Sequence, residues 1–152
     1  MNATDADLLF MSRAMELARR AAVIEEVPVG AVVVSDGQII GEGWNQVIST
    51  QDPTAHAECV ALRDAAQRIG NYRLPASTLY VTLEPCTMCV GALVHARISR
   101  LVFAAREPRA GVVCSQARAL DASYYNHRVV WEEGLLAEES AVLLQGFFQS
   151  RR

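Results

Sequence analysis

Apolar side chains recur every three to four residues near both ends of the chain, a spacing that predicts two amphipathic helices. The first helix is expected over residues 5–23, with Thr4 able to cap its first turn. The last helix is expected over residues 138–149. The apolar positions that would share one face are Leu8, Met11, Met15, Ala18 and Ala22 in the first helix, and Ala141, Leu144 and Phe148 in the last.

Runs rich in β-branched and other strand-forming residues predict the strands between these helices. Residues 30–34 and 38–40 flank Asp36 and Gly37, a pair that favours a tight turn, so a hairpin is expected there. Residues 41–52 are rich in Gly, Asn, Ser and Thr and predict a loop. Further strands are expected over residues 79–83, 99–105 and, at a sheet edge, 128–131.

Two more helices are predicted by their start signals. Asp52 suits an N-cap and Pro53 the first helical position, so a helix is expected from there to about Ile69. Pro85 would open a shorter helix that ends near Ala96.

The order of these elements predicts the fold class. Strands after residue 78 alternate with helices, which favours parallel crossovers, whereas the early hairpin is antiparallel. We therefore expect one domain over residues 1–152, of the α/β class. Its mixed central sheet would lie between helices in a three-layer α-β-α sandwich. Residues 106–127 are irregular in pattern, with a helical stretch expected around residues 116–122.

Composition supports a folded chain in a reducing compartment. Hydrophobic residues make up 51% of the 152 residues and charged residues 20%, which excludes intrinsic disorder. Four cysteines are too few for a disulfide scaffold and suit the cytoplasm. The N-terminus has no signal-peptide pattern, and no apolar stretch is long enough to cross a membrane.

The charge is mildly acidic but unevenly distributed. Net charge is −3, and all 14 basic residues are arginines. Residues 95–118 hold five arginines and one acid, so a basic patch is expected on an otherwise acidic protein. The total excludes a uniformly basic nucleic-acid binder but permits binding through one face.

Two short motifs carry the chemistry. His56 and Glu58 lie near one predicted helix start, and Cys86 and Cys89 lie in the first turn of another. Helix starts favour thiolates, because unpaired N–H groups and the helix dipole stabilise negative charge there. If the two helix starts face each other, one His and two Cys form a three-ligand zinc site with an open position, which is typical of catalytic zinc.

Glu58 is the predicted proton shuttle for such a site. Two residues along a helix turn it about 200° from His56, so it suits the pocket wall better than the metal. Taken singly, these residues have plainer explanations: a redox C-x-x-C pair, a structural His, a solvated Glu. Together, H-x-E followed by P-C-x-x-C is the signature of zinc nucleobase deaminases. Cys59 is expected to be a small core residue, and no role is assigned to Cys114 or His95. His127 is expected to be structural, with an RNA contact as the alternative.

Longer motifs resemble the bacterial tRNA-specific adenosine deaminases, which convert wobble adenosine to inosine and have a cytidine-deaminase-like fold. The resemblance covers nearly the whole chain. It is carried by residues 27–32, 41–45, 52–58, 71–74, 79–86, 88–89, 97–98, 102–103, 126–129 and 147–148.

The resemblance implies roles for individual residues. His56, Cys86 and Cys89 would bind one Zn²⁺ per subunit, and Glu58 would be the general acid/base. Asn45 and the backbone near Ala57 and Cys86 would contact the base. Other substrate contacts would come from Val29, Leu83, Pro85, Glu107, Arg109, Phe147, Phe148, Arg151 and Arg152. The implied partners are a tRNA anticodon stem-loop and a second copy of the chain, since the family is homodimeric.

One departure and several alternatives remain open. Glu107 stands where the family usually has Asp, which adds a methylene at an expected contact to the target nucleotide. The nearest alternative is a small-molecule deaminase of the same fold, acting on cytosine, cytidine, guanine or a pterin-like ring. A structural-zinc RNA-binding module and a redox protein are the others; the first needs no proton shuttle, and the second needs no zinc.

Overall fold

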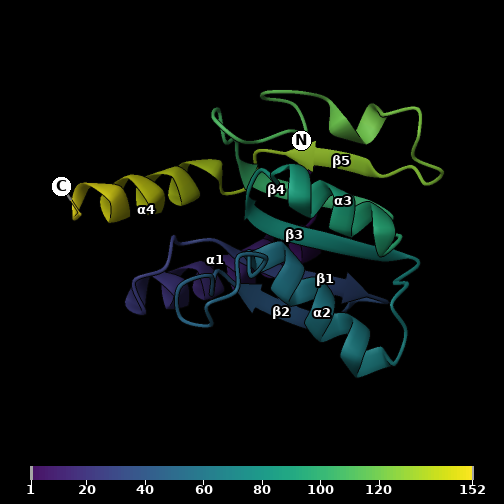
Figure 1. The fold of residues 1–152 in the computed structure, drawn as a ribbon, viewed down its shortest axis with the longest axis horizontal. Helices are drawn as coiled ribbons and strands as arrows, with labels where there is room; N and C mark the ends of the chain where they lie inside the picture. Colours follow the sequence, from purple (N-terminus) through teal and green to yellow (C-terminus); the bar gives the residue numbers. More distant parts are fainter. Residues whose placement is uncertain (1, 152) are drawn as a thin grey trace.

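The computed structural model describes residues 2–151, whose five strands form one mixed sheet in the order β2-β1-β3-β4-β5 (Figure 1). β1 pairs antiparallel with β2 and β3, whereas β3–β4 and β4–β5 are parallel. The strands are β1 (Gly30–Ser35), β2 (Gln38–Trp44), β3 (Ser77–Leu83), β4 (Arg100–Ala105) and β5 (Val130–Glu133).

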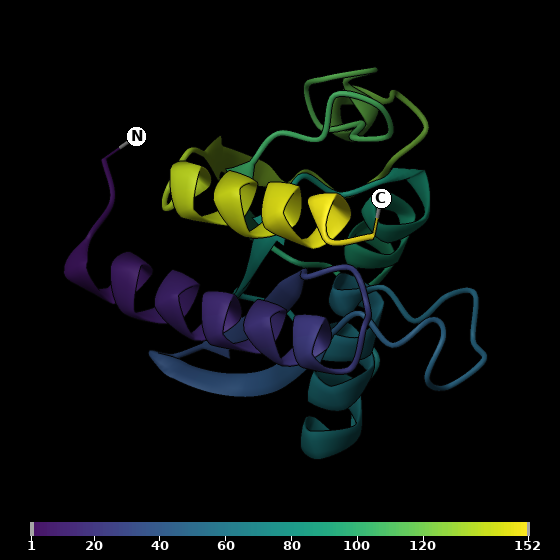
Figure 2. The ribbon, with the colours of Figure 1, turned by 90° about the vertical axis from the view of Figure 1, so that its left-hand side faces the viewer.

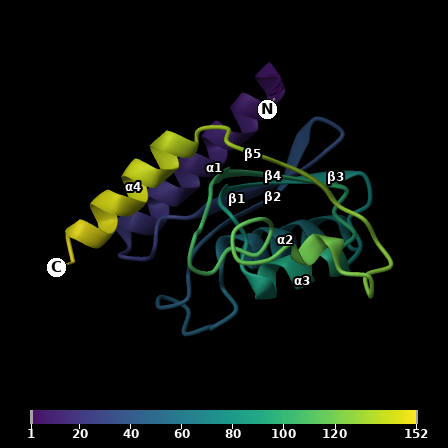
Figure 3. The ribbon, with the colours of Figure 1, turned by 90° about the horizontal axis from the view of Figure 1, so that it is seen from above.

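Helices cover both faces of this sheet. Seen along its edge, α1 (Asp5–Val23) and α4 (Ala137–Gln149) lie on one face, and α2 (Ala57–Ile69) and α3 (Thr87–His95) lie on the other (Figure 3). Figure 2 shows α1 and α4 side by side on their face. The predicted three-layer α-β-α sandwich with a mixed sheet is confirmed.

The two cores follow the alternation of side chains along each strand. Val32 and Val102 face α1, whereas Val33, Val81 and Phe103 face α2 and α3, and all five are fully buried. Apolar side chains therefore point both ways from the sheet, as expected for a sheet covered on both sides.

The glycines of β2 bring α2 against the sheet. A Cβ at Gly41 would lie 2.5 Å from the Ala61 carbonyl oxygen, and one at Gly43 would lie 2.5 Å from the Ala61 nitrogen. Only hydrogen fits between this helix and this strand. The expectation that residues 41–44 belong to a loop is wrong, because their glycines serve helix–strand packing rather than chain flexibility.

Helix starts also differ from the expected positions. α2 begins at Ala57 rather than at Pro53, because Asp52 accepts hydrogen bonds from the N–H and hydroxyl of Thr54 and stabilises a turn instead. α3 begins at Thr87, after Cys86 in the N-cap position. Between β4 and β5, the expected helical stretch is one 3₁₀ turn, Ala119–Asp121.

Strand direction explains where the site forms. β2 and β3 are both antiparallel to β1, so their carboxyl ends meet at the same edge of the sheet. The chain leaves β2 toward Asn45 and His56, and it leaves β3 toward Cys86. Within residues 2–151, no helix combines the length and apolar character needed to cross a membrane.

Candidate active site

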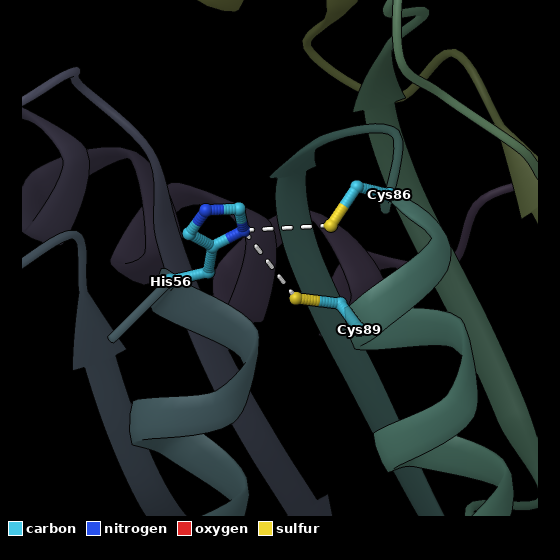
Figure 4. Close-up of side chains that lie close together, drawn as sticks. All are labelled: His56, Cys86 and Cys89. Carbon is cyan, nitrogen blue, oxygen red and sulfur yellow. Dashed lines mark hydrogen bonds between the residues drawn. The ribbon is translucent and has the colours of Figure 1, made fainter. Parts of the chain in front are cut away.

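The three predicted metal ligands converge from two helix starts (Figure 4). His56 is the N-cap of α2, Cys86 is the N-cap of α3, and Cys89 lies in the first turn of α3. His56 Nδ1 is 3.5 Å from Cys86 Sγ and 3.6 Å from Cys89 Sγ. The three ligand atoms all lie within 4.8 Å of one another.

These distances fit zinc. Tetrahedral coordination with usual Zn–S and Zn–N bond lengths places a nitrogen and a sulfur ligand about 3.5 Å apart. The Cys86 thiol is suited to metal binding, because hydrogen bonds from Cys89 and His56 lower its pKa to about 3. Three ligands leave one tetrahedral position for water or substrate, as in catalytic rather than structural sites.

Glu58 lies in the same pocket as the ligands. Its side chain is buried, and burial raises its pKa to about 7, close to the pH at which a proton shuttle works best. The expected opposition to His56 assumed that both residues lie on one helix. His56 instead has the extended backbone of an N-cap, so both residues reach the cavity.

The cavity beside the ligands has a volume of about 260 Å³. Five of the predicted substrate contacts line this cavity. Other lining residues come from the segment before β1 and from those after β3 and β4. The full lining is Val27, Val29, Asn45, His56, Glu58, Leu83, Glu84, Cys86, Glu107, Ala110 and Phe148. A larger hollow of about 700 Å³ lies between α1 and α4, but its lining holds no histidine or cysteine.

Asn45 holds the start of α2. Its side-chain oxygen accepts a hydrogen bond of 2.8 Å from the Ala57 N–H, so that amide is already engaged. The backbone N–H of Asn45 donates a hydrogen bond to the Val29 carbonyl oxygen at 3.2 Å. The backbone bond and the side-chain bond together fix Asn45 at the pocket wall. They also leave its amide nitrogen as the group available to a base.

The other predicted contacts are placed less uniformly. Pro85 is buried and lies outside the lining, and Arg109 is exposed on the loop after β4. Glu107 is on the wall, and its Oε1 accepts a hydrogen bond from the Arg109 N–H. Glu84, to which the sequence assigned no role, is also on the wall.

The C-terminal helix contributes one aromatic side chain to the pocket. Phe148 is half exposed and lines the cavity, whereas Phe147 is partly buried and lies under the Arg151 guanidinium, 3.6 Å from the ring centroid. Neither ring belongs to the buried cores. Arg152 lies outside the described residues.

The expected basic patch is largely neutralised. Arg100 pairs with Asp7 and Glu132. Arg106 pairs with Glu133, and Arg118 pairs with Asp121. A count of charges along residues 95–118 therefore overstates the positive surface, because the compensating acids lie elsewhere in the chain.

Two residues left without a role have definite contacts. Cys59 is half buried, with its Sγ 3.8 Å from that of Cys89, so it borders the ligand cluster. His127 Nε2 lies 2.6 Å from the Ile98 carbonyl oxygen, which indicates a structural role. Neither contact could be predicted from a local pattern, since the partners are about thirty residues apart in the chain.

Comparison with known proteins identifies the family. The sequence model described as "Cytidine and deoxycytidylate deaminase zinc-binding region" matches residues 4–105. The tRNA-specific adenosine deaminase of Haemophilus influenzae is 53% identical over 147 residues, which cover 96% of this chain and 85% of that protein. The chain belongs to the tRNA-specific adenosine deaminase family.

Solved structures agree with this membership. A structure from "Biochemical and Structural Studies of A-to-I Editing by tRNA:A34 Deaminases at the Wobble Position of Transfer RNA" has a TM-score of 0.87 and 43% identity, covering 90% of this chain and 99% of that one. Guanine deaminase from Nitrosomonas europaea has a TM-score of 0.75 and 26% identity, covering 95% and 85%. The matching family model describes a zinc-binding region, and His56, Cys86 and Cys89 form a cluster that could hold such an ion.

Proposed function

We propose that this chain deaminates adenosine to inosine at the wobble position of a tRNA anticodon loop. The observation that carries the proposal is the cluster of His56, Cys86 and Cys89 beside the buried Glu58. The 53% identity with a tRNA-specific adenosine deaminase supports it. His56, Cys86 and Cys89 hold the zinc, and Glu58 moves the protons.

The chemistry is a hydrolysis. Zinc held by these three residues would supply a water molecule of lowered pKa as the nucleophile. The Glu58 carboxylate accepts a proton from that water and delivers it to the purine ring as carbon 6 is attacked. Glu58 then passes the second proton of the water, now on the C6 hydroxyl, to the amino group. The C6–N bond breaks, and adenosine plus water become inosine plus ammonia. A carboxyl group with a pKa of about 7 can serve in both directions at neutral pH.

The pocket recognises one unstacked base. A cavity of about 260 Å³ with apolar walls at Val29 and Leu83 suits a single flat ring. The Asn45 amide supplies a polar contact, and Phe148 and Glu107 lie at other parts of the wall. A base in a hairpin loop reaches such a pocket at less cost than a base in a duplex, because it is already unpaired.

We further propose that binding to tRNA uses the exposed Arg109 and the C-terminal arginines, and that two copies of the chain form the working enzyme. Guanidinium groups suit phosphate oxygens because of their forked geometry. A cytoplasmic location belongs to the same proposal, and it is supported by a tRNA substrate and by four free thiols, which suit a reducing compartment.

The second candidate is deamination of a free nucleobase. It is supported by the resemblance in fold to a guanine deaminase, in which the purine would be bound without RNA. The zinc cluster and proton shuttle alone do not distinguish the two substrates, because both reactions need them.

A comparison of substrates in separate incubations tests the proposal. The zinc-loaded enzyme is incubated with an anticodon stem-loop bearing adenosine at the wobble position, and separately with free adenosine, cytidine and guanine. A stem-loop with guanosine at that position is the matched RNA control. Inosine in the first RNA alone, measured by mass spectrometry of digested nucleosides, is expected. Turnover of a free base or nucleoside without turnover of RNA would overturn the proposal.

A further inference from the structure

The buried carboxylate of Glu84 accepts hydrogen bonds from several residues of one loop. It follows β3 and is 3% exposed. Its Oε2 accepts hydrogen bonds from the N–H groups of Val113, Cys114 and Ser115, at 3.0, 2.9 and 3.0 Å. Its Oε1 accepts from the Glu107 N–H at 3.1 Å and from the Ser115 hydroxyl. Five donors from one loop thus converge on a single side chain.

The loop is wrapped closely around that carboxylate. A Cβ at Gly111 would lie 2.6 Å from Glu84 Oε1 and 2.6 Å from the Glu107 carbonyl oxygen, so only glycine fits. Residues 107–115 contain no helix or strand, and few other bonds tie them to the sheet; one is from the Val112 N–H to the Pro85 carbonyl. The carboxylate is therefore the main hydrogen-bonding anchor of the loop, and the buried Val113 side chain adds apolar packing against the core.

This loop forms one wall of the pocket. Glu107 and Ala110 line the cavity together with Glu84 itself. The Glu84 N–H donates to the Ala105 carbonyl, which ties the residue to the end of β4. Because Cys86 follows two residues later, Glu84 links the metal-binding end of β3 to the wall that faces the substrate.

We propose that Glu84 is a positioning residue, which holds the 107–115 loop so that Glu107 faces the target nucleotide. The proposal rests on the proposed function and names the part of the site that sets substrate affinity. Glu84 acts through the loop and does not touch the reacting atoms.

The first test replaces the acceptor without changing its size. In Glu84→Gln, one side-chain oxygen becomes an NH₂ group that faces donors, which leaves buried N–H groups unsatisfied. We expect KM for the anticodon stem-loop to rise by about tenfold or more, the kcat to change by less than about threefold, and the zinc content to stay at the parent value. Hydrogen exchange of amides 113–115 is expected to accelerate.

Glu26→Gln is the matched control. Glu26 is also a buried glutamate that accepts loop N–H groups, from Ile48 and Ser49, but it and its partners lie outside the cavity lining. A general loss of stability would lower the melting temperature of both variants, whereas only Glu84→Gln is expected to raise KM. Ser115→Ala removes one donor and provides a milder variant if Glu84→Gln fails to fold, with a KM increase of about threefold expected.

A double-mutant cycle with Glu107→Ala decides whether Glu84 acts through Glu107. If it does, Glu84→Gln adds little to the KM of the Glu107→Ala enzyme. Additive effects, or an unchanged KM in both Glu84→Gln and Ser115→Ala, would overturn the positioning role. A parent enzyme that does not deaminate the stem-loop would overturn the proposed function instead, so the two failures are distinguishable.

Discussion

Buried carboxyl groups in this protein differ in protonation because their neighbours differ. Glu58 and Asp7 are both at most 4% exposed. Burial raises the pKa of Glu58 to about 7. Hydrogen bonds from Arg100 and Tyr80, together with one from the Thr4 N–H, outweigh burial at Asp7 and hold its pKa well below the usual range. One environment suits proton transfer, and the other suits a permanent ion pair.

Glu58→Gln is expected to lower kcat by at least about a hundredfold while zinc content stays unchanged, because the amide cannot carry a proton. The measurements are inosine formation and metal analysis of the purified variant. Glu16→Gln, at an exposed position on α1, is the control with unchanged kcat. Loss of zinc along with activity would contradict the assignment and make Glu58 a part of the metal site.

Asp7→Asn is expected to lower the free energy of unfolding by about 3 kcal/mol at neutral pH, because it removes the buried partner of the partly buried Arg100 guanidinium. The stabilisation is fully present above the unfolded-state pKa of about 4, since the folded-state pKa is lower. It is lost as the pH falls through the folded-state value, so the gap between parent and variant narrows in acid.

Urea unfolding at pH 7, 5 and 3 measures this gap. Asp5→Asn is the control for the effect of charge in the first turn of α1, because Asp5 is exposed. A gap of the same size at every pH would show that the carboxylate contributes packing rather than charge.

The residues with local signals were predictable from the sequence. The spacing of His56, Glu58, Cys86 and Cys89 pointed to zinc chemistry without any knowledge of the fold. Glu84 was not predictable, because its five donors lie 23 to 31 residues away along the chain. The contact between Cys59 and Cys89 was hidden for the same reason.

At the scale of elements, periodicity located α1 and α4 and start signals located α2 and α3, but composition misplaced some element boundaries. The glycines of β2 resembled a loop, and Asp52 with Pro53 resembled a helix start. In β2 the glycines are needed because α2 packs directly against the strand backbone. The sequence of the strand alone does not indicate this neighbour. In the second case, a local turn at Asp52 delayed the helix until Ala57.

Gly43→Ala is expected to destabilise the fold by about 2 kcal/mol, because the added methyl overlaps the α2 backbone. Displacement of α2 would also move His56, so zinc affinity is expected to fall. Thermal unfolding with and without added zinc measures both effects. Gly146→Ala in α4, where a Cβ meets nothing within 4 Å, is the control and is expected to stabilise the helix slightly. Equal effects of the two substitutions would contradict the packing argument.

At the scale of the whole molecule, the surface charge could not be predicted from the sequence total. Three of the five arginines in residues 95–118, Arg100, Arg106 and Arg118, pair with acids from α1, β5 and the 3₁₀ turn. The sheet order that brings these elements together was not encoded in any short segment. The remaining exposed guanidinium near the pocket loop is that of Arg109.

Arg109→Ala is expected to weaken binding of the stem-loop and to reduce the slope of log affinity against log salt by about 0.7 to 0.9, the release expected for one phosphate contact. Binding titrations at several salt concentrations measure the slope. Arg68→Ala is the control, because Arg68 pairs with Asp64 on α2. An unchanged slope in Arg109→Ala would place the phosphate contacts elsewhere.

The bare contact between α2 and β2 also limits how the enzyme can be altered. Along that side of the site there are no side chains at Gly41 and Gly43 to trim or exchange, and any enlargement collides with the helix that holds His56. The lining side chains that are clear of this contact lie across the cavity, at Ala110 and at Phe148 on α4. Libraries intended to broaden the range of accepted nucleotides should therefore vary that side and keep the glycine strand fixed.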